Sequence, residues 1–263
     1  MIKILPNTKF SYSLAKGSIS SKTVLCEELN DKVFRRMLQL FEKKNSCGIG
    51  VIKNSYNGIL PEKKYVEIAP LPIRDYDNSG GGVTIQDDKN TLKGYLIELP
   101  ANKKKKLNIL ELSSFMHEST HVLDYLINPK YVANLRKMYE KNIFEKDYFE
   151  VYEKYFYSAD CLQTGTKREI LQKAEEETRK ALKTIPDDEK IIFLNYMKYN
   201  MEMEYHAYNQ DIKYARILQK LGKPIDNESL EDINKTMYFP EKIKLINQLL
   251  HEEISYQKTK ILY

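Results

Sequence analysis

Two histidines and a glutamate stand close together near the middle of the chain, in the run His117-Glu118-Ser119-Thr120-His121. In an α-helix, residues four positions apart lie one above the other, with roughly 5–6 Å between their β-carbons. Both imidazole rings could therefore reach one metal ion. Zinc accepts neutral imidazole nitrogen at about 2.0–2.1 Å, and Glu118 would be placed to take a proton from a water that the ion activates. The spacing predicts a zinc site with Glu118 as the general base.

The residues around this run indicate a buried helix. Asn108 followed by Glu111 is a capping-box-like start, and Pro129 is a stop signal. Apolar residues surround the two histidines on nearly every face of the predicted helix. Imidazoles and a carboxylate in such a place would be costly to desolvate without a partner, which favours a metal ion over hydrogen-bonded core histidines. Only four histidines occur in the chain, and two of them fall in this motif, which argues against a chance match.

A third protein ligand is expected, because a catalytic zinc site normally keeps three protein ligands and one open position. The predicted helix over 188–221 contains Glu202, Glu204 and His206. Glu204 falls on the apolar face of that helix, whereas Glu202 falls on its polar face. A carboxylate on an apolar face needs a partner. Glu204 is therefore the predicted third ligand, with Glu202 or His206 as the alternatives.

Three side chains are candidates for supporting roles around this site. Tyr208 or His206 could donate a hydrogen bond to the oxyanion that forms during acyl transfer. Asp124 shares a helix face with His121, which favours an orienting role beside that histidine over a role as a ligand.

This set of residues resembles the gluzincin branch of zinc metallopeptidases, in which two histidines of a His-Glu-x-x-His helix and a glutamate on a later helix bind zinc. The resemblance implies that His117, His121 and Glu204 bind one zinc ion and that Glu118 is the base. The segment that begins at Glu204 and has Ala207 three positions later is similar to the Glu-x-x-Ala pattern of small bacterial metallopeptidase domains, including toxin and effector types.

The resemblance implies a zinc-dependent endopeptidase that hydrolyses a peptide bond with a metal-activated water. A secreted or translocated effector that acts on a protein substrate is compatible with it. The alternative function is a metal-binding, catalytically idle scaffold for protein interactions. The presence of Glu118 argues mildly against the idle scaffold, because such a protein needs no general base.

The fold class expected for this chain is α+β and predominantly α. Residues 1–105 form an N-terminal α+β subdomain, with a helix over 27–44, a loop over 70–82, and strands over 48–53, 65–69, 83–86 and 95–99. Residues 106–263 form a helical subdomain, with helices over 108–128, 130–157, 167–184, 188–221, 227–235 and 240–260, the second of which could be two helices. Together they would make one catalytic domain.

The resemblance adds a zincin-like arrangement to this fold class. It implies a small mixed sheet with a backing helix and the active-site helix, followed by the helical subdomain. In the resembled family the strand before the active-site helix lies at the sheet edge and pairs with an extended peptide, and residues 94–99 occupy that place here. The alternative is an internal strand that binds nothing.

The charge balance does not favour a nucleic-acid partner. The net charge is +5, but the 42 basic residues face 37 acidic ones and are mostly lysine, including the run Lys103 to Lys106, which is expected to be a solvated loop. The expected partner is a protein or peptide substrate. Three cysteines (Cys26, Cys47 and Cys161) predict neither a disulfide framework nor a cysteine zinc site. With no signal peptide or membrane span in the pattern, the chain is expected in the cytoplasm, and leaderless secretion remains open.

Overall fold

The structure is a computed structural model that describes residues 21–42, 46–61, 64–70, 82–88, 91–99, 106–157, 166–225 and 238–261. The N-terminal elements are α1 (Ser21–Phe41), β1 (Ser46–Gly48), α2 (Ile49–Ile52), the 3-10 helix η1 (Lys53–Tyr56), β2 (Tyr65–Pro70), β3 (Gly82–Asp88), β4 (Thr91–Leu99) and β5 (Lys106–Asn108). The following elements are α3 (Leu112–Ile127), α4 (Pro129–Glu140), the 3-10 helices η3 (Ile143–Glu145) and η4 (Asp147–Phe149), α5 (Glu150–Tyr152), the π-helix η5 (Glu153–Tyr157), α6 (Lys167–Leu182), α7 (Asp187–Lys220) and α9 (Phe239–Ile261). This architecture confirms the predicted α+β, predominantly α class.

The larger sheet contains β2, β4 and β3 in that order. β4 pairs in parallel with β2 and antiparallel with β3, so neighbouring strands take the hydrogen-bonding groups on both of its sides. The prediction that residues 94–99 form an edge strand that binds a peptide is therefore wrong. β3 lies on the outer side of this sheet and contacts α3.

The predicted strand over 48–53 is also wrong, because β1 ends at Gly48 and the chain continues as α2 and η1. Ile49 and Ile52 are buried while Val51 is exposed, which is the i, i+3 spacing of a helix and not the alternation of a strand. β1 pairs antiparallel with β5, which directly precedes the segment leading into α3. This pairing connects the two sides of the predicted boundary at residue 105.

The other predicted strands and the long helices are present with small shifts at their ends. The segment 130–157 is not one helix: α4 ends at Glu140 and short helical turns follow, in agreement with the alternative of a divided segment. Four sequence predictions lie outside the described residues: the loop over 70–82, apart from its two end residues, the lysine run from 103 to 105, Cys161, and the helix over 227–235.

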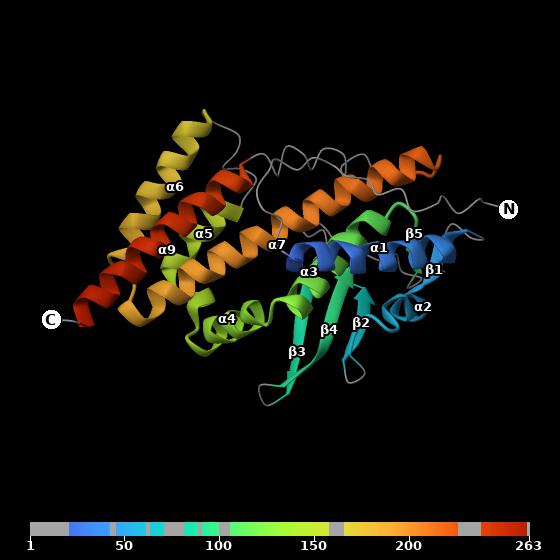
Figure 1. Cartoon of the computed structure of the whole chain (residues 1–263), viewed down its shortest axis with the longest axis horizontal. Helices are drawn as coiled ribbons and strands as arrows, with labels where there is room; N and C mark the ends of the chain where they lie inside the picture. The colour runs from blue at the N-terminus through green and yellow to red at the C-terminus, as the bar shows by residue number, and fades with distance from the viewer. Residues whose placement is uncertain are drawn as a thin grey trace.

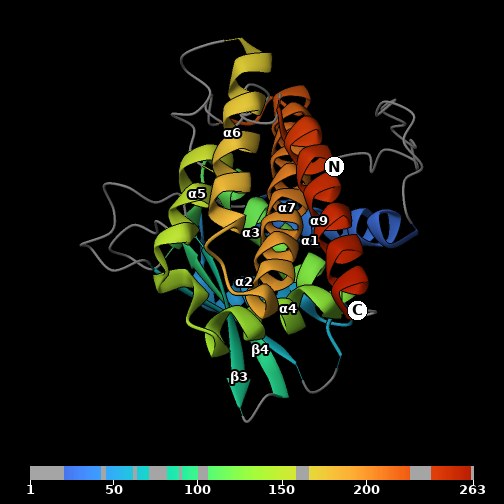
Figure 2. The same ribbon diagram turned by 90° about the vertical axis from the view of Figure 1, so that its left-hand side faces the viewer.

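The buried apolar side chains form two clusters, and most of the elements that carry them lie toward opposite ends of the molecule (Figure 1). The first contains buried side chains of α1, the larger sheet, α3 and the end of α7, and the second contains those of α5, α6, α9 and the first half of α7. Figure 2 views the end of the molecule where α6, α7 and α9 run side by side. Side chains of these three helices belong to the second cluster. The 34 residues of α7 extend over about 50 Å and belong to both clusters.

Among the described helices, none combines the length and the apolar character that crossing a membrane requires.

Candidate metal centre

A capping box fixes the start of the segment that leads into α3. Oδ1 of Asn108 accepts hydrogen bonds from the backbone N–H groups of Leu110 and Glu111, at 2.8 and 3.1 Å. In return, Oε2 of Glu111 accepts from the backbone N–H of Asn108 at 2.7 Å. This reciprocal pair has the hydrogen bonds of the predicted box. It closes the turn between β5 and α3, whereas α3 itself starts at Leu112 with Glu111 as its N-cap residue and no side-chain cap.

The structure brings His117, His121 and Glu204 together at the contact between α3 and α7. Nε2 of His117 lies 3.4 Å from Oε2 of Glu204, and Nε2 of His121 lies 3.6 Å from Oε1 of Glu204. The two imidazole rings are 4.8 Å apart between centroids and nearly perpendicular, at 81°. One ligand atom from each residue lies within 4.8 Å of those of the others. Three donors thus converge from two helices.

These separations fit a tetrahedral zinc ion. With zinc bonds of about 2.0–2.2 Å, two ligand atoms on the edge of a tetrahedron are about 3.3–3.6 Å apart. The N–O separations of 3.4 and 3.6 Å match that edge, and both are long for a hydrogen bond. Two imidazole nitrogens and a carboxylate are the donors that catalytic zinc sites use. The three residues therefore fit zinc in both chemistry and spacing.

The electrostatics of the site favour a cation. Burial lowers the pKa of His121 to about 4, so this imidazole is neutral. Burial alone would raise the pKa of Glu204, but His121 and His117 outweigh it and lower the pKa. For His117, burial is opposed by Asp211 and Glu204, which raise its pKa well above 6.5. The two carboxylates of Glu204 and Asp211 thus face a single imidazolium, that of His117, and this balance of charge favours a cation.

Glu118 lies next to His117 on α3 and is only 6% exposed. Burial raises the pKa of its carboxyl to about 8, and the charges of Glu204 and Asp211 add to the effect, while His117 opposes it. A carboxyl with a pKa close to neutral is suited to accept and return a proton near pH 7.

Asp211 is a site residue that the sequence analysis missed. Its Oδ2 lies 2.7 Å from Nδ1 of His117, and its carboxylate is buried. A histidine that donates through Nδ1 presents the lone pair of Nε2 to a metal ion. Asp211 stands seven positions after Glu204, two helical turns along the same face of α7. That repeat of an acidic residue on the apolar face was the signal available in the sequence.

The two predicted supporting residues Asp124 and His206 bind each other. Nδ1 of His206 lies 3.0 and 3.1 Å from the carboxylate oxygens of Asp124, and Oδ1 of Asp124 also accepts from the thiol of Cys26 at 3.4 Å. Asp124 and His206 act on His121 only through their charges, because Nδ1 of His121 has no hydrogen-bond partner among the described residues. Tyr208 contacts the predicted zinc triad: its ring lies edge-on to His117, with the centroids 4.8 Å apart. Of the three supporting candidates, Tyr208 thus lies beside the triad, whereas Asp124 and His206 lie together in a separate cluster with Cys26.

The alternative ligand Glu202 faces away from the triad. The hydroxyl of Tyr131 donates to Oε2 of Glu202 at 2.9 Å, and Lys198 lies 3.9 Å from its other oxygen. Of the two glutamates, the structure brings Glu204 to the histidines.

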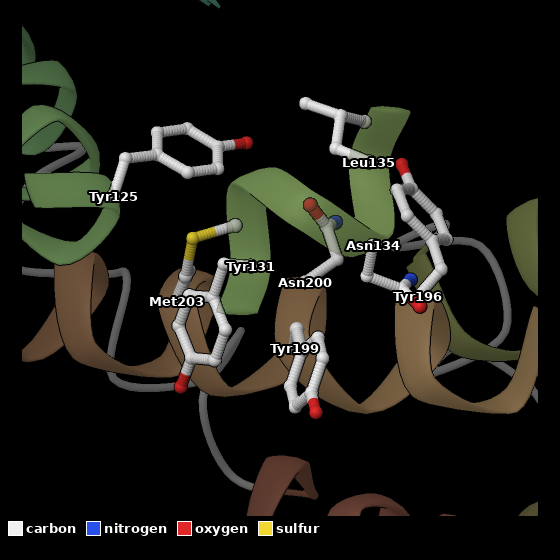
Figure 3. Close-up of a pocket in the computed structure, with 8 residues that line it drawn as sticks. All are labelled: Tyr125, Tyr131, Asn134, Leu135, Tyr196, Tyr199, Asn200 and Met203. Atoms are coloured by element: carbon white, nitrogen blue, oxygen red, sulfur yellow. The ribbon is translucent and has the colours of Figure 1, made fainter. Parts of the chain in front are cut away.

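A small pocket lies between α3, α4 and α7, beyond the triad (Figure 3). Tyr125, one turn after His121, points its hydroxyl toward α4, and the rings of Tyr131 and Tyr199 stack with centroids 4.5 Å apart. The remaining lining residues are Asn134, Leu135, Tyr196, Asn200 and Met203. The pocket has room for about one water molecule.

Comparison of the chain with protein-family models, with curated protein sequences and with solved structures finds no match.

Proposed function

We propose that this protein is a zinc-dependent endopeptidase. The observation that carries the proposal is the convergence of His117, His121 and Glu204, whose ligand atoms are spaced like those of a tetrahedral zinc site. The neighbouring buried carboxyl of Glu118 adds a proton acceptor. Ligands and base together form the minimum set for hydrolysis of a peptide bond by an activated water.

The residues divide the chemistry among them. A bound zinc ion would supply a Lewis acid that polarises the scissile carbonyl and makes a water acidic near neutral pH. Glu118 would take the proton from the attacking water and return it to the leaving amine. Asp211 would hold the imidazole of His117 in one orientation through Nδ1. The edge-on ring of Tyr208 limits how far His117 can turn.

A peptide substrate would pair with the outer strand β3. In the described part of the larger sheet, β3 has β4 on one side only, and it contacts α3, which carries Glu118. An extended peptide can add to such an edge through main-chain hydrogen bonds. β3 would thus take the role that the family resemblance implied for residues 94–99.

Cleavage of a mixed peptide library by the zinc-loaded protein tests the proposal, with Glu118→Gln as the matched variant. Gln keeps the size of the side chain and removes its basicity. We expect zinc content to be unchanged and the cleavage rate to fall by about 100-fold or more. The variant His251→Ala is the control, because His251 is exposed on α9, and it should cleave like the unmodified protein.

The same measurement separates the peptidase from the idle scaffold. Zinc bound by His117, His121 and Glu204, with no cleavage that depends on Glu118, would establish the scaffold and overturn the peptidase. Loss of zinc in His117→Ala but not in His251→Ala is expected under both functions, since both need the metal site. Zinc content therefore tests the site, and the Glu118→Gln comparison tests the chemistry.

A further inference from the structure

Cys26, Asp124 and His206 form a second group of metal-binding side chains, on three different helices. Cys26 lies on α1, Asp124 on α3 and His206 on α7. One donor atom from each residue lies within 4.8 Å of the others. Cys26 is 1% exposed and Asp124 is 6% exposed, so the group is enclosed. Its members are distinct from the three residues assigned to the catalytic zinc.

We propose that Cys26, Asp124 and His206 form a second, structural zinc site that fastens α1 to α3 and α7. Thiolate, imidazole and carboxylate are donors that zinc prefers. Magnesium and calcium prefer oxygen ligands, so the thiolate favours zinc over both. The S–O distance of 3.4 Å is close to the edge of about 3.5 Å of a tetrahedron built on zinc bonds of about 2.0–2.3 Å. The N–O distances of 3.0 and 3.1 Å are those of a hydrogen bond, so the ion would replace the proton between His206 and Asp124 and widen this separation to about 3.3 Å.

The first supporting observation is the amide of Gln210. Its Nε2 lies 3.3 Å from Nε2 of His206, while its Oε1 is buried and has no partner among the described residues. If Nδ1 of His206 binds a metal ion, the proton moves to Nε2, which then has to donate. Turning the amide of Gln210 by 180° places Oε1 there as the acceptor. In that arrangement the buried oxygen of Gln210 gains a partner.

The second supporting observation is the amide of Asn30, which is fully buried. The hydroxyl of Thr120 donates to the carbonyl of Met116 at 2.8 Å, so it accepts from Nδ2 of Asn30 at 3.1 Å. That bond fixes the direction of the amide. Nδ2 of Asn30 also faces Sγ of Cys26 at 4.0 Å, the contact that a thiolate would strengthen.

Asn30 also has, among the described residues, an unpaired acceptor on its amide. Its Oδ1 is buried and, within the described part of the chain, has no hydrogen-bond partner. Unpaired buried amide oxygens are rare in folded proteins, because each loses its hydration. Two of them, on Asn30 and Gln210, flank this one cluster. The oxygen of Gln210 would gain a partner when an ion binds Nδ1 of His206.

Cobalt substitution tests this site separately from the catalytic one. Co²⁺ bound to a thiolate gives an intense charge-transfer absorption in the near ultraviolet, and the donors His117, His121 and Glu204 include no sulfur. We expect the full-length protein to bind about two Co²⁺ ions per chain and to show this band. Cys26→Ser should lose the band and about one of the two ions, whereas Cys47→Ser, the half-buried control, should keep both.

The double variant His117→Ala, His121→Ala should lose the other ion and keep the thiolate band. Failure of the peptidase proposal leaves the band unaffected, so the two proposals can fail independently. X-ray absorption of the zinc-loaded unmodified protein covers the case in which Cys26→Ser does not fold. It should show a sulfur neighbour at about 2.3 Å. Absence of sulfur there, or a cobalt band that persists in folded Cys26→Ser, would overturn the site and leave a hydrogen-bonded network only.

Discussion

Oδ2 of Asp211 lies 2.7 Å from Nδ1 of His117, although the two residues are 94 positions apart in the chain. The contact joins α7 to α3 and leaves Nε2 of His117 as the nitrogen that faces Glu204. A carboxylate behind a zinc-binding histidine fixes the tautomer and makes the ring a better donor. In the proposed zinc site, this pair would hold His117 in the orientation of a ligand before the ion binds.

Replacing this carboxylate should weaken zinc binding without removing a ligand. We expect Asp211→Ala to reduce zinc affinity about 10–100-fold, the range that follows loss of such a partner. Competition with a chromophoric chelator measures the change. Asp188→Ala on the same helix is the control, because Asp188 is exposed and pairs with Lys141. Equal zinc affinity in both variants would remove Asp211 from its positioning role.

The choice between two glutamates can be tested by paired substitutions. Glu204→Gln should abolish tight zinc binding at the catalytic site, because it replaces a charged ligand that lies between both histidines. Glu202→Gln should leave zinc affinity unchanged, since Glu202 binds Tyr131 and Lys198. Equilibrium dialysis with zinc gives both values. The opposite ranking of the two variants would show that the wrong carboxylate has been assigned.

Zinc should stabilise the folded protein. An ion present at about 100 times its dissociation constant adds about 2.7 kcal/mol, which corresponds to a rise of roughly 5–10 °C in Tm for a chain of this size. Differential scanning calorimetry with and without a chelator measures this rise. The double variant His117→Ala, His121→Ala should show a smaller rise, because it retains only the site at Cys26. If zinc does not change the Tm of the unmodified protein, both metal sites are contradicted.

The start of α6 should contribute stability that depends on pH. Oε2 of Glu169 accepts hydrogen bonds from the backbone N–H and the hydroxyl of Thr166, at 2.7 and 2.9 Å, and these lower the pKa of Glu169 below its ordinary value of 4.5. A carboxyl whose pKa is lower in the folded state adds stability above pH 4.5, and this stability is lost as the pH falls through the folded pKa.

Urea unfolding of the unmodified protein and of Glu169→Gln checks this sign. The unmodified protein should unfold at the higher urea concentration at pH 7. The two midpoints should converge as the pH falls through the folded pKa of Glu169, because the protonated carboxyl has the shape of glutamine. A difference that grows on acidification would contradict the assignment. Glu176→Gln, on the same helix, provides a comparison outside the cap.

The sequence predicted the parts of the site that local geometry determines. The pair His117 and His121 needs only the pitch of a helix, and the assignment of Glu204 needs only the apolar face of another. The pairing of His117 with Asp211 depends on how α3 packs on α7, which a single helix pattern does not encode. Cys26 joins Asp124 and His206 for the same reason, because α1 reaches them only through tertiary packing.

The errors in the fold have a similar cause. The segment over 48–53 has the apolar content of a strand, but strands form only where partners exist, and β1 ends at Gly48. Burial of Ile49 and Ile52 against the first cluster selects the helix instead. Whether β4 lies at the edge or the centre of its sheet depends on the positions of β2 and β3. The order of the strands is a property of the whole sheet, and it cannot be read from the residues of β4 alone.

The continuity of α7 affects the dynamics of the site. Both ends of this helix are anchored, one in each apolar cluster, and Glu204 stands near its middle. Fraying at a helix end is therefore far from the carboxylate, and loosening of one cluster leaves the other to hold the helix. The backbone amides around Glu204 should rank among the slowest in the chain to exchange with deuterium, so the ligand geometry persists while the periphery fluctuates.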